Sequence, residues 1–189
     1  IQTVATVAGN LCNASPAADG APPLLVLDAE VELAARDGSR CLPLRDFLVG
    51  NRRTLCRAAE LVPAIRIPKA SAGGRSAFFK LGARRYLVIS VAMASVRLER
   101  GPDSAVTRAA VAVGACSAAA RRLDRLERGL VGCRSAADVE RAIAEAPIDE
   151  LSPIDDVRAS AAYRLEAVRE IVRRAVLQAM GETPETRAA

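Results

Sequence analysis

Residues 5–19 read ATVAGNLCNASPAAD, a run of small side chains that passes into a polar segment ending at Asp19. Small side chains let the backbone approach a ligand closely, and successive N–H groups can then bind phosphate oxygens. Most segments of this composition simply turn the chain. This stretch alone therefore leaves both a phosphate-binding loop and an ordinary turn open, and the residues after it have to decide between them.

The length and composition are those of a globular protein. The 189 residues are enough for one good core or two small ones, and 51% of them are hydrophobic and 26% charged. No apolar run in the sequence reaches the roughly 18 residues of a membrane span, and the first residues lack the basic segment of a secretory signal. We expect a cytoplasmic protein. Because the chain begins with Ile rather than Met, we expect it to be a piece of something longer.

Missing residue types exclude several kinds of site. The chain has no His, which excludes Ser-His-Asp and Cys-His catalysis and removes the commonest zinc ligand. Its five Cys include no C-x-x-C pair, so the sequence predicts neither a disulfide framework nor a zinc or iron–sulfur cluster. The thiols are expected to be reduced and mostly to act as small hydrophobic side chains.

The net charge of +5 raises the question of an anionic partner, such as a nucleic acid or a membrane surface. The arginines alternate with acids, as in residues 121–128 (RRLDRLER), which is typical of a solvated helix face. Aromatic residues make up 3% of the chain, too few for base stacking. We therefore expect no nucleic-acid partner.

The first part of the chain is expected to form short strands and turns. Its apolar and polar pattern predicts strands at residues 24–33, 40–44 and 65–68, a turn at 36–39 and a helical turn at 44–50. Pro22 and Pro23 are expected to break the chain, and Pro43 indicates that its strand is an edge strand or ends there. Residues 69–75 have no apolar periodicity and are the best candidate for a domain boundary.

The second part predicts three strands and then three helices. The strands are expected at residues 76–81, 86–99 and 105–116, and the helices at 117–128, at 136–146 and from 161 to a stop at 181. The strands fit an antiparallel meander, and Ser117 and Ser135 are candidate N-caps. Strands and helices in separate runs indicate an α+β fold rather than one doubly wound sheet.

Five motifs in collinear order add a resemblance to a known family. Residues 6–10 (TVAGN) and 13–19 (NASPAAD) are similar to T-(I/V)-G-G-N and A-S-P-x-x-D, the second flavin-binding motif of the FAD subunit of molybdenum hydroxylases. The similarity continues at residues 46–50 (DFLVG), 60–62 (ELV) with 65–68 (IRIP), 78–85 (FFKLGARR) and 153–164 (PIDDVRASAAYR). The chain thus resembles the medium, flavoprotein subunit of the xanthine dehydrogenase and aerobic carbon monoxide dehydrogenase family over nearly its whole length.

The resemblance implies a domain organisation. Residues 1–72 would be the second subdomain of an FAD-binding domain, an antiparallel sheet with short helices. Residues 73–181 would be a C-terminal flavoprotein domain, a three-stranded antiparallel sheet with a three-helix bundle. Residues 182–189 would be a flexible tail.

The resemblance also implies a role as an oxidoreductase subunit. The chain would bind FAD, take electrons from a partner subunit holding two [2Fe-2S] clusters, and pass them to NAD⁺, a quinone, oxygen or another acceptor. Substrate hydroxylation would occur at a molybdopterin site on a third, large subunit, in a dimer of heterotrimers. No catalytic residue and no metal would lie on this chain.

The family comparison implies which residues would contact FAD. Backbone N–H groups of residues 6–10, with the Thr6 hydroxyl and the Asn10 amide, would bind the pyrophosphate. Asp19 would accept hydrogen bonds from ribityl or ribose hydroxyls. Val62 resembles an aliphatic contact of the family and Lys80 a cation near the flavin, with a surface lysine at a strand end as the alternative for Lys80. The full expected set is Thr6, Val7, Ala8, Gly9, Asn10, Asn13, Asp19, Val62 and Lys80.

The sequence departs from the family pattern in three places. The Gly-rich FAD motif of an N-terminal subdomain is absent, so a separate chain or segment would have to supply it. Ala8 stands where the family usually has Gly, which adds a methyl group at a close approach to phosphate, and residues 2–3 (QT) replace Arg-Asn. These departures leave a second interpretation open, a flavin-free interaction subunit of the same fold.

Three further features have simpler interpretations. Asp155 and Asp156 suggest a metal pair, but no third ligand is close in sequence, so we expect them to serve the start of a helix through charge and hydrogen bonding. Tyr163 is expected to be a packed helix residue that donates one hydrogen bond. Cys12 is expected to be a buried thiol rather than a redox group.

Overall fold

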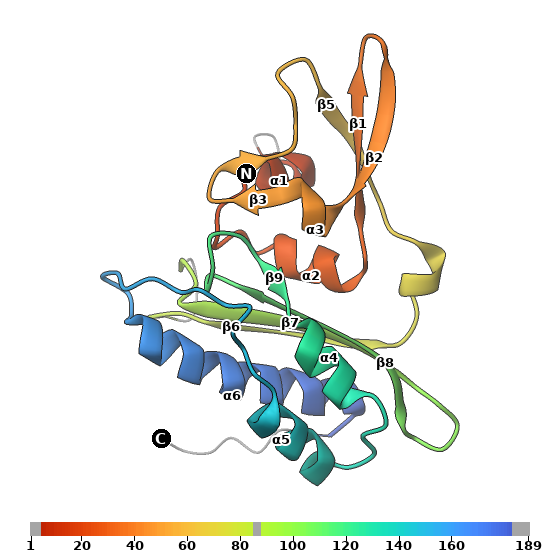
Figure 1. Cartoon of the computed structure of the whole chain (residues 1–189), viewed down its shortest axis with the longest axis vertical. Helices are drawn as coiled ribbons and strands as arrows, with labels where there is room; N and C mark the ends of the chain where they lie inside the picture. The colour runs from red at the N-terminus through yellow and green to blue at the C-terminus, as the bar shows by residue number, and fades with distance from the viewer. Residues whose placement is uncertain (1–4, 85–87, 183–189) are drawn as a thin grey trace.

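Two hydrophobic cores organise this protein. The computed structural model describes residues 5–84 and 88–182. One core lies mostly within the N-terminal part, and the other lies between the C-terminal sheet and its helices. In Figure 1 the N-terminal part sits above the long sheet, and the C-terminal helices lie below it.

The N-terminal part is a small antiparallel sheet with short helices. Its elements are α1 (Val7–Asn13), α2 (Ala21–Val26), β1 (Glu30–Ala35), β2 (Gly38–Pro43), α3 (Leu44–Phe47), β3 (Leu48–Gly50), β4 (Arg53–Thr54), β5 (Leu61–Arg66) and the 3-10 turn η1 (Lys69–Ser71). The sheet order is β2-β1-β5, and β3 pairs with β4. Within β1, Val31 and Leu33 are buried while Glu30 and Glu32 are half-exposed, which confirms the expected alternation.

The strand expected at residues 24–33 is wrong in its first half. Residues 21–26 form α2, and the strand begins at Glu30. Pro22 lies in the first turn of the helix, where the N–H that it lacks would have no intrahelical partner, so the two prolines start a helix rather than break the chain. The edge position inferred from Pro43 is confirmed, because β2 is at the end of its sheet.

The C-terminal part is an antiparallel meander covered by helices. Its elements are β6 (Arg75–Leu81), β7 (Ala92–Arg100), β8 (Val106–Gly114), β9 (Arg121–Arg122), α4 (Asp124–Leu130), α5 (Ala136–Glu145) and α6 (Ala161–Met180). The order β6-β7-β8-β9 confirms the expected meander and adds a fourth short strand. Residues 88–91 are not part of β7, and residues 85–87 of the expected strand lie outside the described residues.

Both faces of the central strand β7 are buried. Every residue from Ala92 to Leu98 is buried, because α6 packs against one face of the sheet and α2 against the other. The strands facing α2 are rich in alanine, which lets the helix come close. A Cβ on Gly114 would lie 3.0 Å from Cγ of Pro22 in α2. The N-terminal part is therefore packed directly onto the C-terminal sheet (Figure 1).

The helix expected at residues 117–128 is wrong in its first half. Arg121 and Arg122 pair with β8 as strand β9, and α4 begins only at Asp124. Ser117 caps no helix; its Oγ donates to the Cys116 carbonyl at 2.6 Å and accepts from the Ser152 N–H at 3.0 Å. A strand pairing with distant residues therefore overrides the local helical pattern.

The other two expected helices are confirmed. Ser135 caps α5 in a capping box with Asp138, and α6 runs from Ala161 to Met180 and ends at Gly181, whose φ is +93°. The left-handed conformation at that position favours glycine. Within the described part of the chain, even the 20-residue α6 is too polar to cross a membrane.

Two arginines of the sheet join it to the C-terminal end of α2. Arg97 is 4% exposed and its Nε donates to the Val26 carbonyl at 2.8 Å. Arg122 donates to the Leu25 carbonyl and to Asp28 Oδ1, both at 2.8 Å. Burial raises the pKa of Asp28, but hydrogen bonds from Arg122 and Ser71 outweigh that effect and hold it below its usual value. Cations here also complement the negative end of the helix dipole.

Candidate functional site

The first half of the opening stretch is a helix rather than a loop. Thr6 has extended backbone angles and caps α1, and its Oγ1 accepts a hydrogen bond from the Gly9 N–H at 2.9 Å. The first N–H groups of an α-helix have no acceptor within the helix. Thr6, Val7, Gly9 and Asn10 are exposed, so the N-terminal end of α1 is open to solvent. The stretch that was expected to bind phosphate as a loop thus presents a helix terminus, and helix N-termini are places where anions can bind.

Because Ala8 lies in a helix, the alanine that replaces the family's glycine fits the backbone there. This residue lies within α1 and is not among the described residues with positive φ, so its methyl group causes no backbone strain. Gly9 has a different role. A Cβ at that position would lie 2.9 Å from Thr6 Oγ1, so glycine leaves room for the capping hydroxyl.

The side chain of Asn10 reaches the residue next to Asp19. A Cβ on Gly20 would lie 2.8 Å from Asn10 Oδ1, so the amide packs over a position where only glycine fits without movement. Gly20 is a site residue that the sequence analysis missed, although a glycine directly after the A-S-P-x-x-D pattern was a visible signal. Asn13 is exposed at the C-terminal end of the same helix.

Asp19 and Lys80 form an ion pair. Lys80 lies in β6, 61 residues after Asp19, and its Nζ lies 2.6 Å from Asp19 Oδ2. The hydroxyl of Ser90 donates to Asp19 Oδ1 at 3.4 Å. The charge of Lys80 therefore faces another residue of the expected set, while Lys80 itself is exposed near the end of β6, as the surface-lysine alternative also expects.

Val62 lies on β5, apart from the contacts that join Asn10, Gly20, Asp19 and Lys80. It is half-buried and packs against the N-terminal core, which contains Leu11 of α1. The structure thus gathers Thr6–Asn10, Gly20, Asp19 and Lys80 along one continuous run of contacts. It places Val62 on the strand that lies against α1.

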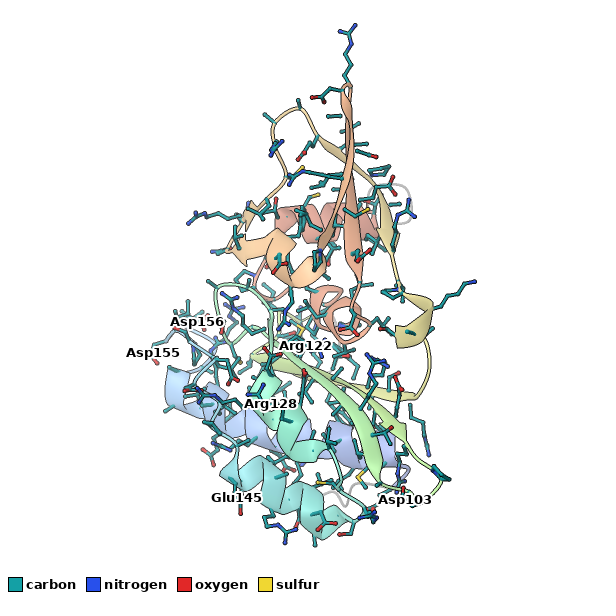
Figure 2. All side chains as sticks on the ribbon, turned by 45° about the vertical axis from the view of Figure 1, so that its right-hand side comes forward. Asp103, Arg122, Arg128, Glu145, Asp155 and Asp156 are labelled. Atoms are coloured by element: carbon teal, nitrogen blue, oxygen red, sulfur yellow. The ribbon has the colours of Figure 1, made fainter. Side chains whose placement is uncertain are left out.

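The acid pair before α6 stabilises the start of that helix, as expected. Asp155 Oδ1 accepts from the Ala161 N–H at 2.6 Å, and Asp156 Oδ1 accepts from Arg164 at 2.7 Å. Figure 2 labels both acids beside the N-terminal end of α6. Hydrogen bonds from Arg158 hold the pKa of Asp156 well below its usual value. The described residues contain no group of His, Cys, Asp or Glu side chains that could hold a metal ion.

Two smaller expectations are wrong. Tyr163 is 51% exposed, because it lies on the outer face of the first turn of α6 rather than in the core. Cys12 is exposed rather than buried, although partial burial and the nearby Cys56 raise the pKa of its thiol. Cys116 and Cys133 are the buried thiols, and burial raises the pKa of Cys116 to about 11.

Comparison with known proteins covers both parts of the chain. The sequence model described as the FAD binding domain in molybdopterin dehydrogenase matches residues 1–70, and that of the CO dehydrogenase flavoprotein C-terminal domain matches residues 77–179. A putative xanthine dehydrogenase FAD-binding subunit of Escherichia coli is 29% identical over 95% of this chain and 62% of its own length. The carbon monoxide dehydrogenase medium chain of Afipia carboxidovorans is 33% identical, again over 95% of this chain and 62% of its own length.

The fold agrees with these matches. A chain of reconstituted CO dehydrogenase from Oligotropha carboxidovorans superposes with a TM-score of 0.87 at 27% identity, over 96% of this chain and 63% of that one. The protein thus spans a little over three fifths of the length of these relatives. By sequence and by structure, the chain belongs to the family of FAD-binding medium subunits of xanthine and carbon monoxide dehydrogenases.

Proposed function

We propose that this protein binds FAD through the run of residues from α1 to Lys80 and carries electrons between a partner subunit and an external acceptor. One run of contacts carries the proposal: the Asn10 side chain packs on Gly20, and Asp19, the residue before Gly20, pairs with Lys80. This contact joins a helix N-terminus to a charged pair in one surface. FAD supplies the redox chemistry when bound, because its ring accepts electrons and releases them again.

The donors and acceptors of this surface fit the polar parts of FAD. The open N–H groups at the start of α1 suit pyrophosphate oxygens, and the Asn10 amide can add N–H donors because its Oδ1 faces Gly20. Asp19 carries an acceptor that suits ribityl or ribose hydroxyls. We assign Thr6, Val7, Ala8, Gly9 and Asn10 to the pyrophosphate side and Val62 to an aliphatic contact, and Asn13 stays in the proposed set at the other end of α1.

Lys80 serves two purposes in this proposal. Its ammonium group has three N–H donors, and the pair with Asp19 holds it in one direction. A donor held beside the ligand can stabilise negative charge on reduced FAD. The same ion pair orients the Asp19 carboxylate, so each side chain positions the other.

The wider assembly follows from the relatives. Several are named as FAD subunits or medium chains of dehydrogenases, so we propose an iron–sulfur partner and a molybdopterin-binding large subunit, in a dimer of heterotrimers. The FAD surface would lie mainly in residues 1–72 and the C-terminal flavoprotein domain in 73–181, with residues 182–189 as a flexible tail. Nucleic acid is not a proposed partner, because several exposed arginines pair with acids, as Arg45 does with Asp124 and Arg125 with Asp149.

Flavin binding tests the proposal. The chain is purified with and without a polypeptide corresponding to the remaining length of its relatives, and bound flavin is read from its visible absorbance. We expect Asp19→Asn and Lys80→Met to weaken flavin binding by roughly 10- to 100-fold, because hydrogen bonds to charged groups contribute about 1.5–3 kcal/mol.

Matched controls are available in the same chain. Lys69 is the only other lysine and lies on η1, and Asp37 lies in the exposed turn between β1 and β2. Lys69→Met and Asp37→Asn should leave flavin binding unchanged. A complete protein that takes up no flavin would instead support the flavin-free interaction subunit.

A further inference from the structure

A cleft of about 610 Å³ lies where the two parts of the molecule meet. Its walls come from six places in the chain: residues 15–17, 51–52, Ile89, 115–121, 150–158 and Arg164 of α6. In Figure 1 the loop before α2, the connection after β8 and the connection before α6 come together on the left of the molecule. The fold therefore builds this cleft from distant segments, and the proposed FAD contacts do not account for it.

Two arginines in the walls of the cleft have no ion-pair partner among the described residues. Arg52 and Arg121 are exposed in its walls, and neither pairs with an acid among the residues that the structure describes. The backbone N–H of Arg52 donates to the Ala14 carbonyl at 3.0 Å, which fixes the turn that presents its side chain. Arg158 and Arg164, in contrast, both pair with Asp156. The two unpaired guanidinium groups are therefore the ones available to an acidic partner.

A buried donor also remains without a partner in the same wall. Arg164 is 1% exposed and uses its terminal nitrogens on Asp156 and on the Val91 and Ala115 carbonyls. Its Nε has no acceptor within residues 5–84 and 88–182. Oε2 of Glu150 likewise has no donor among these residues. Buried polar atoms without partners are uncommon in native proteins. Both atoms belong to residues that line the cleft, so this wall is polar as well as charged.

Apolar side chains continue from the cleft onto the surface beside it. Ile89 and Ile154 line the cleft and are 63% and 69% exposed. Val157 is fully exposed on the same connection, and Tyr163 follows in the first turn of α6. Exposed apolar residues rimmed by charges mark interaction surfaces. Because this apolar area extends beyond the cleft, it fits a polypeptide better than a small ligand.

The cleft lies next to the residues assigned to FAD. Residues 15–17 belong to the same loop as Asp19, and Ile89 directly precedes Ser90, which donates to Asp19. A partner docked in the cleft would therefore sit beside the flavin surface. This position suits an electron donor.

We propose that this cleft is the docking surface for the electron-donating iron–sulfur chain. The partner inserts a loop in which a carboxylate side chain lies between apolar residues. The carboxylate pairs with Arg52 and Arg121, and the apolar residues cover Ile89 and Ile154. The identity of this partner rests on the proposed function above, whereas the location of the surface rests on the cleft.

The test uses the full chain, co-expressed with its iron–sulfur and molybdopterin partners and then separated from them. The affinity of this chain for the isolated iron–sulfur chain is measured at several salt concentrations. We expect the double variant R52E/R121E to bind about tenfold or more weakly than wild type and to lose most of the salt dependence, because opposite charges steer and hold such complexes. Ile154→Asp should weaken binding to a similar degree.

The control variant is R36E/R128E. Arg36 and Arg128 are exposed, pair with no acid among the described residues and lie outside the cleft. This variant should bind like wild type, and all variants should keep their flavin and their circular dichroism, which separates docking from flavin binding and folding.

Three results would overturn the proposal. The first is equal affinity of R52E/R121E and R36E/R128E for the iron–sulfur chain. The second is tight binding of inorganic pyrophosphate that R52E/R121E abolishes while the complex still forms, which would make the cleft a small-anion site. The third is a flavin-loaded wild-type chain that binds no iron–sulfur chain, which would overturn the electron-transfer role as well.

Discussion

At the scale of single residues, the most constrained side chain is a buried arginine. Arg164 is 1% exposed, yet the sequence shows it only as the last residue of a motif at a helix start. It joins α6 to the Val91 carbonyl just before β7, to the Ala115 carbonyl just after β8, and to Asp156. A charge buried in this way is retained because several acceptors share it.

Replacing Arg164 should destabilise the protein strongly. In Arg164→Leu two buried carbonyls lose their donor, so we expect the free energy of unfolding to fall by about 2–4 kcal/mol. Urea titration measures the change. Arg158→Leu is the control, because Arg158 contacts the same acid from a more exposed position and should cost less than about 1 kcal/mol. Equal losses in the two variants would show that Arg164 contributes only its charge.

A single carboxylate should give the protein a defined sensitivity to acid. Glu60 accepts from Arg40 at 2.7 and 2.9 Å and from the Arg57 N–H at 2.8 Å. The hydrogen bonds from Arg40 lead the effects that lower its pKa from 4.5 to about 2. Because the folded-state pKa is lower than the unfolded one, this stabilisation is complete above pH 4.5 and is lost as the pH falls toward 2.

Unfolding measured from pH 6 down to about pH 2 tests this effect. Glu60→Gln should be less stable than wild type at neutral pH and should show a shallower loss in the acid range. Parallel curves for the two proteins would contradict the assignment. Asp37→Asn, in an exposed turn, serves as the control.

At the scale of elements, local signals predicted some segments and tertiary contacts decided the others. The capping box at Ser135 and the glycine at position 181 lie within their own helices, so α5 and α6 could be read from the sequence. The strand β9 could not, because Arg122 pairs with β8 and donates to the C-terminal end of α2. The loop expected at residues 6–10 became a helix for a local reason that was overlooked, namely that Thr6 is a good N-cap.

The cap of α1 can be tested directly. Thr6→Ala removes the hydrogen bond from Gly9, so α1 should lose about 1 kcal/mol of stability and flavin binding should weaken with it. Thr6→Ser keeps the hydroxyl and should behave like wild type. Hydrogen exchange of the α1 amides measures the first effect, and flavin absorbance measures the second. Faster exchange with unchanged flavin binding would remove the α1 terminus from the proposed site.

At the scale of the whole molecule, the candidate site exists because the N-terminal part packs through α2 on the C-terminal sheet. The family motifs pointed to Asp19 and Lys80 separately, but only the packing of α2 on β7 and β8 brings β6 to the loop before α2. The cleft is a product of the same packing, since six separate segments of the chain form it. No periodicity or spacing in the sequence encodes such a convergence, which is why Arg52 and Arg121 were missed.

The arginines that join the two parts should make unfolding a single event. Arg97 and Arg122 bind the C-terminal end of α2 from within the sheet, whereas the Arg45–Asp124 pair crosses the same junction at the surface with both side chains about half exposed. We expect Arg97→Met to cost about 3–5 kcal/mol and Arg45→Met about 0–1 kcal/mol. In Arg97→Met the amides of α2 and β1 should exchange with solvent before those of β7, because the N-terminal core has lost its buried link. Simultaneous exchange of all three elements in Arg97→Met would show that apolar packing of α2 alone couples the two parts.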